Sequence, residues 1–496
     1  MKKTNYRRGI KPARNQKLGS WTTKDVVLNA VTYAINLLIM IFLFVLTVGL
    51  TGKDIEAYFE NVTSFVHFLI LLILTFSVMV FYFLYEDRDF MKNAANTEML
   101  FLIIELSLMI SFSFGNYINP YLRPLALVAV LTLFLSNRKT AIFMNVIFCV
   151  IIFLFDTFSP VKMFDYGSNY YPALIMCFSS GIIATFCTDK VRSRSTLLLR
   201  SVLISVPTII CVGMSLIEHG SSNGPIADLI YGALSGPLAV AIFIVLLPIF
   251  EVLFMKVSCF KFSELTDHKA KLIRKMITEA PGTFNHSIVV SNIAEACASA
   301  IGEDSLLART CAYYHDVGKL RRPEYFKENQ SDGVDTHKDL TPELSANIIK
   351  SHTIDGYNLV LKNGLPREIA DVCIQHHGTL PIIYFYDKAK KFTDGEVDLS
   401  QYCYPGPKPK TKIAAIIMIA DGCEAAARSL QDRSRENVKK VVRKIVNDRM
   451  ELGQFEDCEI TLKEINIIIH TVVNNLTGIY HNRIEYPKVN LDGMEL

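Results

Sequence analysis

Residues 306–319 read LLARTCAYYHDVGK, and the periodicity of this stretch indicates how the second half of the chain folds. Its apolar residues recur every three or four positions, which is the period of a helix with one buried face. The helix ends in a histidine and an aspartate, His315 and Asp316, and Gly318 closes it. Strand-like alternation is nearly absent beyond Lys256, so we expect an all-α domain around this helix.

Three more helical segments of this half carry residues that could bind a metal ion. One begins near Asn285, one covers residues 369–377 and one covers residues 413–428. A single histidine in such a segment is more often structural than a ligand, but here the pattern is joint. Five histidines and two aspartates follow one another beside apolar helical sequence: His286, His315, Asp316, His352, His376, His377 and Asp421.

Imidazoles and carboxylates that converge from different helices are the ligands of hydrolytic metal centres, which keep open positions for water and phosphate oxygen. Neighbouring helical residues point about 100° apart. His315 could therefore bind a first metal ion while the two oxygens of Asp316 bridge to a second, and His376 and His377 could bind one ion from a helix end. A nitrogen and oxygen set without thiolate favours iron, manganese or zinc. We predict two divalent metal ions, with iron or manganese preferred.

The first half of the chain is a series of apolar blocks. A membrane-spanning helix needs about 20 mostly apolar residues. Eight blocks are candidates: residues 26–50, 65–85, 97–115, 122–135, 141–158, 170–187, 197–217 and 229–255. The fourth is the shortest, and no AxA cleavage pattern follows the first, which we interpret as an anchor. We therefore predict a polytopic helical membrane domain.

Basic residues predict the orientation of these spans, because lysine and arginine prefer cytoplasmic loops. They are frequent in residues 1–25 and in the loops after the second, fourth and sixth blocks. We expect the N-terminus and the C-terminal domain in the cytoplasm of a bacterial cell, below its inner membrane. A transporter would need more intramembrane charge than Glu105, the one carboxylate in the middle of a block. The net charge of +3 is too small to indicate a nucleic-acid polymer as partner.

Several strings resemble one known family. The residues YHDVGK at 314–319 look like the signature of the HD phosphohydrolase superfamily, in which His286 would be the first ligand and Asp421 the last. The longer strings are similar to the seven-transmembrane HD family, the PgpH-type cyclic di-AMP phosphodiesterases: EAPGT (279–283), ENQ (328–330), YPGPKP (404–409) and RIEYP (483–487). The resemblance covers roughly residues 65–487.

The resemblance implies a division of the ligands between two metal ions. One ion would be held by His286, His315, Asp316 and Asp421, and the other by His352, His376 and His377 with the bridging Asp316. It further implies hydrolysis of cyclic di-AMP to linear pApA, with the cyclic dinucleotide and the lipid bilayer as partners; a homo-oligomer stays open. Such family members carry a sizeable extracellular domain after the first span, whereas here only residues 51–64 lie between the first two blocks.

We assign catalytic roles to Asp316, as the bridge, and to Lys319, as a clamp for phosphate charge. Arg321, Arg322, Lys408 and Lys410 are weaker candidates for that clamp. Two alternatives remain open: a membrane receptor whose HD domain binds a nucleotide without turnover, and an HD hydrolase for another nucleotide. The Gly-Tyr-Pro signature of the cyclic di-GMP branch is absent after His377, where the chain reads GTLPIIY.

The expected domain organisation follows from these patterns. It comprises a basic cytoplasmic leader (1–25), a transmembrane helical bundle (26–255), a linker (256–280), an HD phosphohydrolase domain (281–482) and a tail (483–496). The eleven cysteines are scattered without a CxxC pair, which is typical of a reduced cytosolic domain rather than of a disulfide framework.

Overall fold

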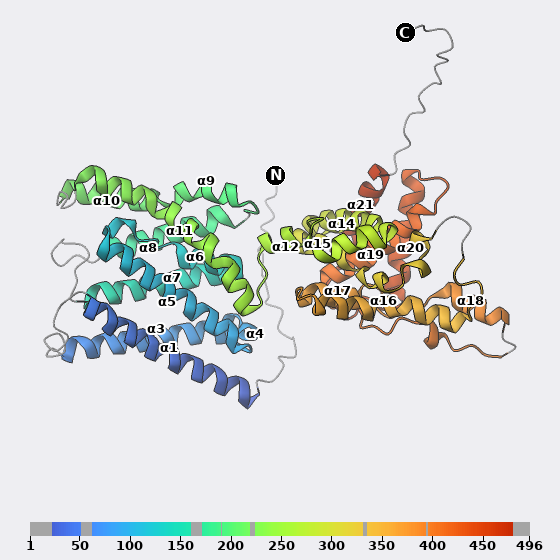
Figure 1. Cartoon of the computed structure of the whole chain (residues 1–496), viewed down its shortest axis with the longest axis horizontal. Helices are drawn as coiled ribbons and strands as arrows, with labels where there is room; N and C mark the ends of the chain where they lie inside the picture. Colours follow the sequence, from blue (N-terminus) through green and yellow to red (C-terminus); the bar gives the residue numbers. More distant parts are fainter. Residues whose placement is uncertain are drawn as a thin grey trace, which may run out of the picture. The chain divides into compact units, whose positions relative to one another are not determined.

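The computed structural model describes residues 22–50, 62–159, 171–189, 191–218, 224–330, 335–392 and 395–479. Most of the expected leader and all of the expected tail lie outside these residues. The chain divides into two compact units, Met1–Lys256 and Val257–Leu496 (Figure 1). Within the described residues both units are helical, and an isolated bridge between Pro381 and Cys403 is the only β pairing. The all-α prediction is confirmed.

The first unit contains the apolar helices that the sequence predicts. Its elements are α1 (Thr23–Leu50), α3 (Val62–Glu86), α4 (Arg88–Met91), α5 (Ala94–Tyr117), η1 (Pro120–Leu122), α6 (Leu127–Leu135), α7 (Arg138–Phe158), α8 (Tyr171–Thr188), α9 (Arg194–Ile204), α10 (Val206–Glu218) and α11 (Pro225–Phe254). Among the described residues, six helices are long and apolar enough to cross a membrane, and Pro120–Leu135 and Ala173–Thr188 are shorter apolar segments. These eight segments coincide with the eight predicted blocks.

The fourth block departs from a regular helix. We expected it to begin at residue 122, but α6 begins only at Leu127. Pro124 disfavours helical geometry in the residue before it, and that residue, Arg123, instead turns its guanidinium to Asp156 at 2.6 Å. Arg123 is only 3% exposed. Non-helical backbone at membrane depth is tolerated where protein covers it, and this ion pair keeps the segment inside the bundle.

The seventh block is interrupted at Ser205, between α9 and α10. The hydroxyl of Ser205 donates to the carbonyl of Ala233 at 2.7 Å and accepts the N–H of Gly236 at 2.9 Å. A Cβ on Gly236 would lie 2.3 Å from the carbonyl oxygen of Ser201. The glycine therefore allows α11 to approach the break closely, and the hydroxyl satisfies backbone groups there.

The second unit begins with two helices in the segment that we expected to be a linker, α12 (Cys259–Leu265) and α13 (Lys271–Glu279). Leu272, Ile273 and Met276 of α13 are buried in the core of the unit. The other helices are α14 (Pro281–Ile301), α15 (Ser305–Tyr314), α16 (Pro342–Lys362), α17 (Arg367–Gln375), α18 (Ile383–Phe392), α19 (Lys412–Arg428), α20 (Arg435–Glu451) and α21 (Leu462–Ile479), with the 3₁₀ turns η2 (Val317–Arg321), η3 (Pro323–Tyr325), η4 (Lys327–Asn329) and η5 (Leu399–Tyr402).

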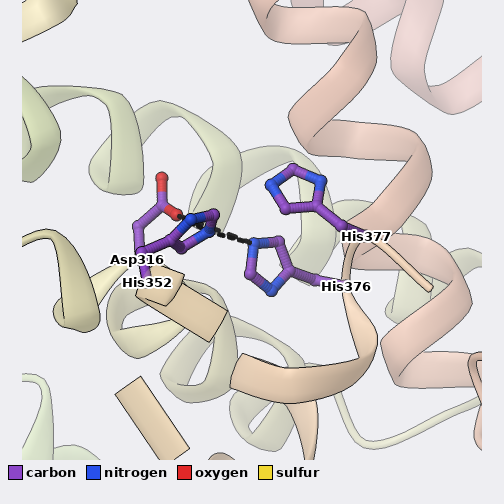
Figure 2. A group of neighbouring side chains, drawn as sticks. All are labelled: Asp316, His352, His376 and His377. Carbon is purple, nitrogen blue, oxygen red and sulfur yellow. Dashed lines mark hydrogen bonds and ion pairs between the residues drawn. The ribbon is translucent and has the colours of Figure 1, made fainter. Parts of the chain in front are cut away.

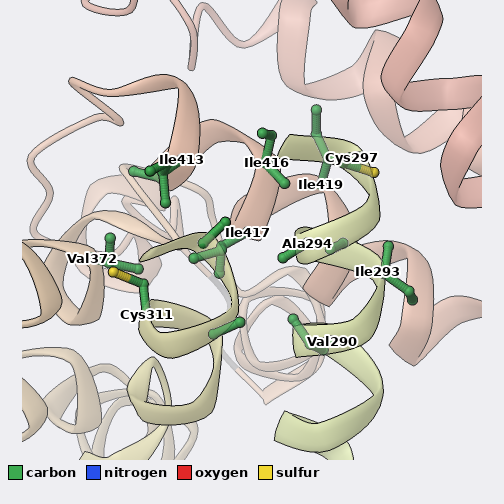
Figure 3. Close-up of a cluster of buried hydrophobic side chains, with 14 of the residues drawn as sticks. Val290, Ile293, Ala294, Cys297, Cys311, Val372, Ile413, Ile416, Ile417 and Ile419 are labelled. Atoms are coloured by element: carbon green, nitrogen blue, oxygen red, sulfur yellow. The ribbon is translucent and has the colours of Figure 1, made fainter. Parts of the chain in front are cut away.

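The core of the second unit is centred on α19. Its residues Ile416, Ile417 and Ile419 are fully buried, and they pack with side chains of α14, α15 and α17 (Figure 3). Burial of each such side chain contributes about 1.5–3 kcal/mol. A helix that is apolar nearly all round belongs in the interior. Because α19 occupies that position, it places Asp421 next to His286 of α14 and to His377, which follows α17.

Candidate metal centre

The two ligand doublets lie where helices end rather than inside them. His315 caps α15, and Asp316 precedes the turn η2; His376 likewise caps α17. Gly318 explains the turn, because a Cβ there would lie 1.9 Å from the carbonyl oxygen of His352. Only glycine lets η2 pack so closely on α16, and this contact brings His352 beside Asp316.

Four of the predicted ligands form one group. Figure 2 shows Asp316, His352, His376 and His377 converging from three different elements. The Oδ1 atom of Asp316 lies 3.3 Å from Nε2 of His352 and 3.6 Å from Nε2 of His376. The ring of Tyr404 stacks on His377 with 4.3 Å between the ring centroids, which covers this side of the group.

Two other predicted ligands, His315 and His286, lie near the second oxygen of Asp316, and Asp421 lies next to His286. Its Oδ2 atom is 3.3 Å from Nε2 of His315 and 3.7 Å from Nε2 of His286. The same nitrogen of His286 is 3.0 Å from Oδ1 of Asp421. Each oxygen of Asp316 therefore faces its own pair of histidines, which is the arrangement that a bridging carboxylate needs. All seven side chains occur in overlapping groups whose potential ligand atoms lie within 4.8 Å of one another.

Backbone carbonyls orient three of the imidazoles. Nδ1–H of His315 donates to Ala312 at 2.7 Å, that of His352 to Ile349 at 2.6 Å, and that of His376 to Cys373 at 2.8 Å, in each case three residues earlier in the chain. With the proton held on Nδ1, the lone pair of Nε2 points to the centre of the group. This is how metal-binding histidines are usually fixed.

The protonation states of His376, His377 and Asp316 suit a metal ion. Burial lowers the pKa of His376 and holds that of His377 well below its usual value, so both rings are neutral. Burial alone would raise the pKa of Asp316, but Lys319 and His315 outweigh it and hold it well below the ordinary range. Burial lowers the pKa of His286, but hydrogen bonds with Asp421 and Glu424 outweigh this and raise it to about 10, so a metal ion that binds Nε2 would displace a proton from this ring.

The residues present also fit a divalent cation by their unmet hydrogen bonds. Nε2 of His315 and Oδ1 of Asp316 are buried and make no hydrogen bond. Leaving a buried polar atom unsatisfied costs about 1–3 kcal/mol. A cation bound by nitrogen and oxygen donors would satisfy both atoms at once, and the set matches iron, manganese or zinc rather than a thiolate metal.

Lys319 contacts the group directly. Its Nζ lies 2.7 Å from Oδ2 of Asp316 and 2.7 Å from Oε1 of Glu328. Burial lowers the pKa of Lys319, but the two carboxylates outweigh it and raise it, so the ammonium stays charged. Two of the weaker candidates for the phosphate clamp form ion pairs elsewhere, Arg321 with Asp355 and Lys408 with Glu456.

Two of the quoted sequence strings meet in space and position Glu328. The backbone N–H of Thr283 donates to Oδ1 of Asn329 at 3.1 Å, and the amide of Asn329 donates to the hydroxyl of Thr283 at 2.9 Å. A Cβ on Gly282 would lie 1.8 Å from the carbonyl oxygen of Glu328. The strings EAPGT and ENQ are therefore the two sides of one tight contact, which presents Glu328 to Lys319.

A pocket of about 460 Å³ reaches the group from the side of His286 and Asp421. Besides these two residues, the lining consists of Lys319, Lys327, Glu328, Glu424, Ala425, Arg428 and Ser429. The sequence analysis did not single out Lys327, Glu424 or Arg428. A signal for Glu424 was present, because it follows Asp421 by three positions and so shares its helix face.

Comparisons with known proteins identify the class of the second unit. Residues 283–426 match the HD domain family, and this part of the chain is an HD domain, the domain of metal-dependent hydrolases. Residues 32–258 match the family described as a 7TM receptor with intracellular HD hydrolase. These two matches follow each other in this order and cover most of each unit, and the first unit is a membrane domain of apolar helices.

Two curated relatives share the name cyclic-di-AMP phosphodiesterase PgpH. The Bacillus subtilis protein is 36% identical over 431 residues, which are 85% of this chain and 60% of that protein. The Listeria monocytogenes protein is 37% identical over 393 residues, 78% of this chain and 52% of that protein. The chain therefore spans less than two thirds of their length. The L. monocytogenes PgpH HD domain solved with cyclic-di-AMP is 48% identical, with a TM-score of 0.41, covering 43% of this chain and 99% of that one.

Proposed function

We propose that the chain is a membrane-anchored phosphodiesterase that uses two divalent metal ions, iron or manganese, to hydrolyse cyclic di-AMP to linear pApA. The observation that carries the proposal is the position of Asp316, whose two oxygens face separate groups of histidines. The names of the curated relatives support the choice of cyclic di-AMP.

In this proposal the seven ligands divide as the resemblance implies. His286, His315 and Asp421 hold one ion, His352, His376 and His377 hold the other, and Asp316 contacts both. The bound ions would supply Lewis-acid polarisation of the phosphate and a water of lowered pKa. The protein orients the imidazoles through their Nδ1 hydrogen bonds and keeps Lys319 beside Asp316 at 2.7 Å, where its charge can favour a phosphate group.

The cations of the pocket would receive the phosphates of the nucleotide. Lys319 is paired with Glu328, and Arg428 is paired with Glu424. Among the described residues, no ion pair is found for Lys327, so its ammonium is the most available to a phosphate. We expect Lys327→Met to raise the KM severalfold and to change kcat little; an unchanged KM would exclude Lys327 from nucleotide binding.

We further propose that the catalytic domain lies in the cytoplasm and that the membrane is the inner membrane of a bacterial cell. The basic loops after the second, fourth and sixth apolar segments support this orientation. A cytoplasmic position would give the pocket access to a soluble nucleotide messenger. No nucleic-acid polymer is required as a partner.

The direct test incubates the purified full chain, in lipid nanodiscs with Mn²⁺ or anaerobic Fe²⁺, with cyclic di-AMP, cyclic di-GMP and guanosine tetraphosphate in parallel. We expect pApA from cyclic di-AMP, faster than turnover of the other two, and no turnover after chelation. Nucleotide binding that survives chelation, without turnover under any metal, would instead indicate a receptor. Preference for guanosine tetraphosphate would overturn the choice of substrate.

A further inference from the structure

A buried carboxylate contacts the ring of His286 on the side away from the metal group. Oε2 of Glu424 lies 2.6 Å from Nδ1 of His286. Glu424 belongs to α19 and is only 1% exposed, while His286 belongs to α14. Nε2 of the same imidazole points the other way, to Asp421 at 3.0 Å. The imidazole therefore lies between the carboxylate of Glu424 on one side and the other predicted metal ligands on the opposite side.

His286 differs in this respect from His315, His352 and His376. Those three donate Nδ1–H to the carbonyl of the residue three positions earlier. A carboxylate is a stronger acceptor than a carbonyl, because a charged partner roughly doubles the strength of a hydrogen bond. A carboxylate behind a histidine fixes its tautomer and ring orientation and makes its free nitrogen a better ligand.

Glu424 is itself held in place. Arg428, one turn later on α19, donates Nε at 3.1 Å and Nη2 at 2.5 Å to Oε1, while Oε2 serves His286. A carboxylate buried this deeply needs such partners to stay ionised. Arg428 lines the pocket, so it stabilises the carboxylate from the solvent side.

We propose that Glu424 is a positioning residue for the metal site that contains His286. It accepts the Nδ1–H of His286, which orients the ring so that Nε2 faces the candidate metal site, and Arg428 holds Glu424 in place. The inference rests on the proposed function in one respect, the role of His286 as a ligand. It does not depend on the identity of the nucleotide.

A purely structural role is the competing explanation, because Glu424 also joins α14 to α19. Metal affinity separates the two. Loss of a partner behind a ligating histidine typically costs about 10–100-fold in metal affinity, whereas loss of a helix–helix contact lowers stability without selecting one metal site. Glu295 offers a matched control, since it lies on α14 and pairs with Arg309 at 2.6 Å.

The experiment compares the full chain in nanodiscs with Glu424→Ala, Glu424→Gln and Glu295→Gln. Mn²⁺ binding is measured by calorimetry, melting temperature by scanning fluorimetry, and turnover as a function of Mn²⁺ concentration. We expect Glu424→Ala to lose about 10–100-fold in affinity at one of two sites, and to recover most of its turnover in excess Mn²⁺. Glu424→Gln keeps an oxygen that accepts Nδ1–H, so its loss should be smaller. Glu295→Gln should bind as wild type does.

The proposal is overturned if Glu424→Ala and Glu424→Gln bind Mn²⁺ as tightly as wild type, or if Glu295→Gln loses the same affinity. If Glu424→Ala does not fold, the near-isosteric Glu424→Gln decides, and an unchanged affinity in it refutes the positioning role. A wild-type chain that binds Mn²⁺ but does not hydrolyse cyclic di-AMP would contradict the proposed substrate and leave this comparison intact. A wild-type chain that binds no metal would refute both proposals.

Discussion

Asp316→Asn is the substitution that tests the two-metal arrangement most directly. The two carboxylate oxygens of Asp316 face separate histidine pairs at 3.3–3.7 Å. The asparagine side chain has the same shape, but an NH₂ group that cannot bind a metal ion replaces one of these oxygens. Loss of one metal ion removes several kcal/mol of charge stabilisation in the transition state. At 1.36 kcal/mol for each factor of ten, a loss of about 4 kcal/mol lowers kcat on the order of a thousandfold.

The assay measures metal content, turnover of cyclic di-AMP and melting temperature for this variant in parallel with Asp371→Asn. Asp371 is a partly exposed carboxylate whose ion pair with Arg367, at 3.8 Å, lies on α17. We expect Asp316→Asn to hold at most one metal ion, and Asp371→Asn to behave as wild type. Retention of two ions and of more than a tenth of the turnover would refute the bridging role of Asp316.

Three further predictions concern other parts of the chain. His352→Ala should keep one metal ion, lose most turnover and still bind the nucleotide; full metal content in this variant would contradict its role as a ligand. A hydrogen bond from Lys412 lowers the pKa of Glu464 from 4.5 to about 2, so its contribution to stability is present above pH 4.5 and lost as the pH falls towards 2. Glu464→Gln should therefore destabilise the fold by about 1 kcal/mol at pH 7 and by nothing near pH 2, as measured by denaturant unfolding. A loss of stability that does not depend on pH would show that the charge of Glu464 is not its cause. Reporter fusions after Arg138 and Met255 should both report a cytoplasmic location. A location outside the cytoplasm for both fusions would show that the short fourth segment does not cross the membrane.

The sequence singled out the seven side chains that the structure brings together, because each of them lies in or beside an apolar helical segment. The sequence could not show that the doublets lie at helix ends. We expected His315 and Asp316 within one helix, about 100° apart, but the close contact of Gly318 with the carbonyl of His352 ends the helix before them. That contact joins residues 34 positions apart, and local periodicity carries no information about such a pair.

In the membrane unit, too, local sequence patterns could not predict a contact between distant residues. Hydropathy was sufficient to locate the eight apolar segments, because length and composition alone decide whether a helix can span a bilayer. It could not reveal that Arg123 pairs with Asp156, 33 residues away. Pro124 disfavours helical backbone at Arg123, and this ion pair lets the resulting irregular stretch stay buried in the bundle. Charged residues near the ends of apolar segments are ambiguous until their partners are known.

The surroundings of Lys319 change how its role should be understood. The sequence predicts a clamp for phosphate, which requires a charge that the protein does not already neutralise. In the structure its ammonium lies 2.7 Å from both Asp316 and Glu328. A metal ion that binds Asp316 would draw on the same carboxylate and weaken its hold on Lys319. Lys319 would then keep Glu328 as its partner and gain freedom to interact with phosphate, because it also lines the pocket. In the proposed function, metal binding at Asp316 and the availability of Lys319 to phosphate would therefore be coupled through one carboxylate.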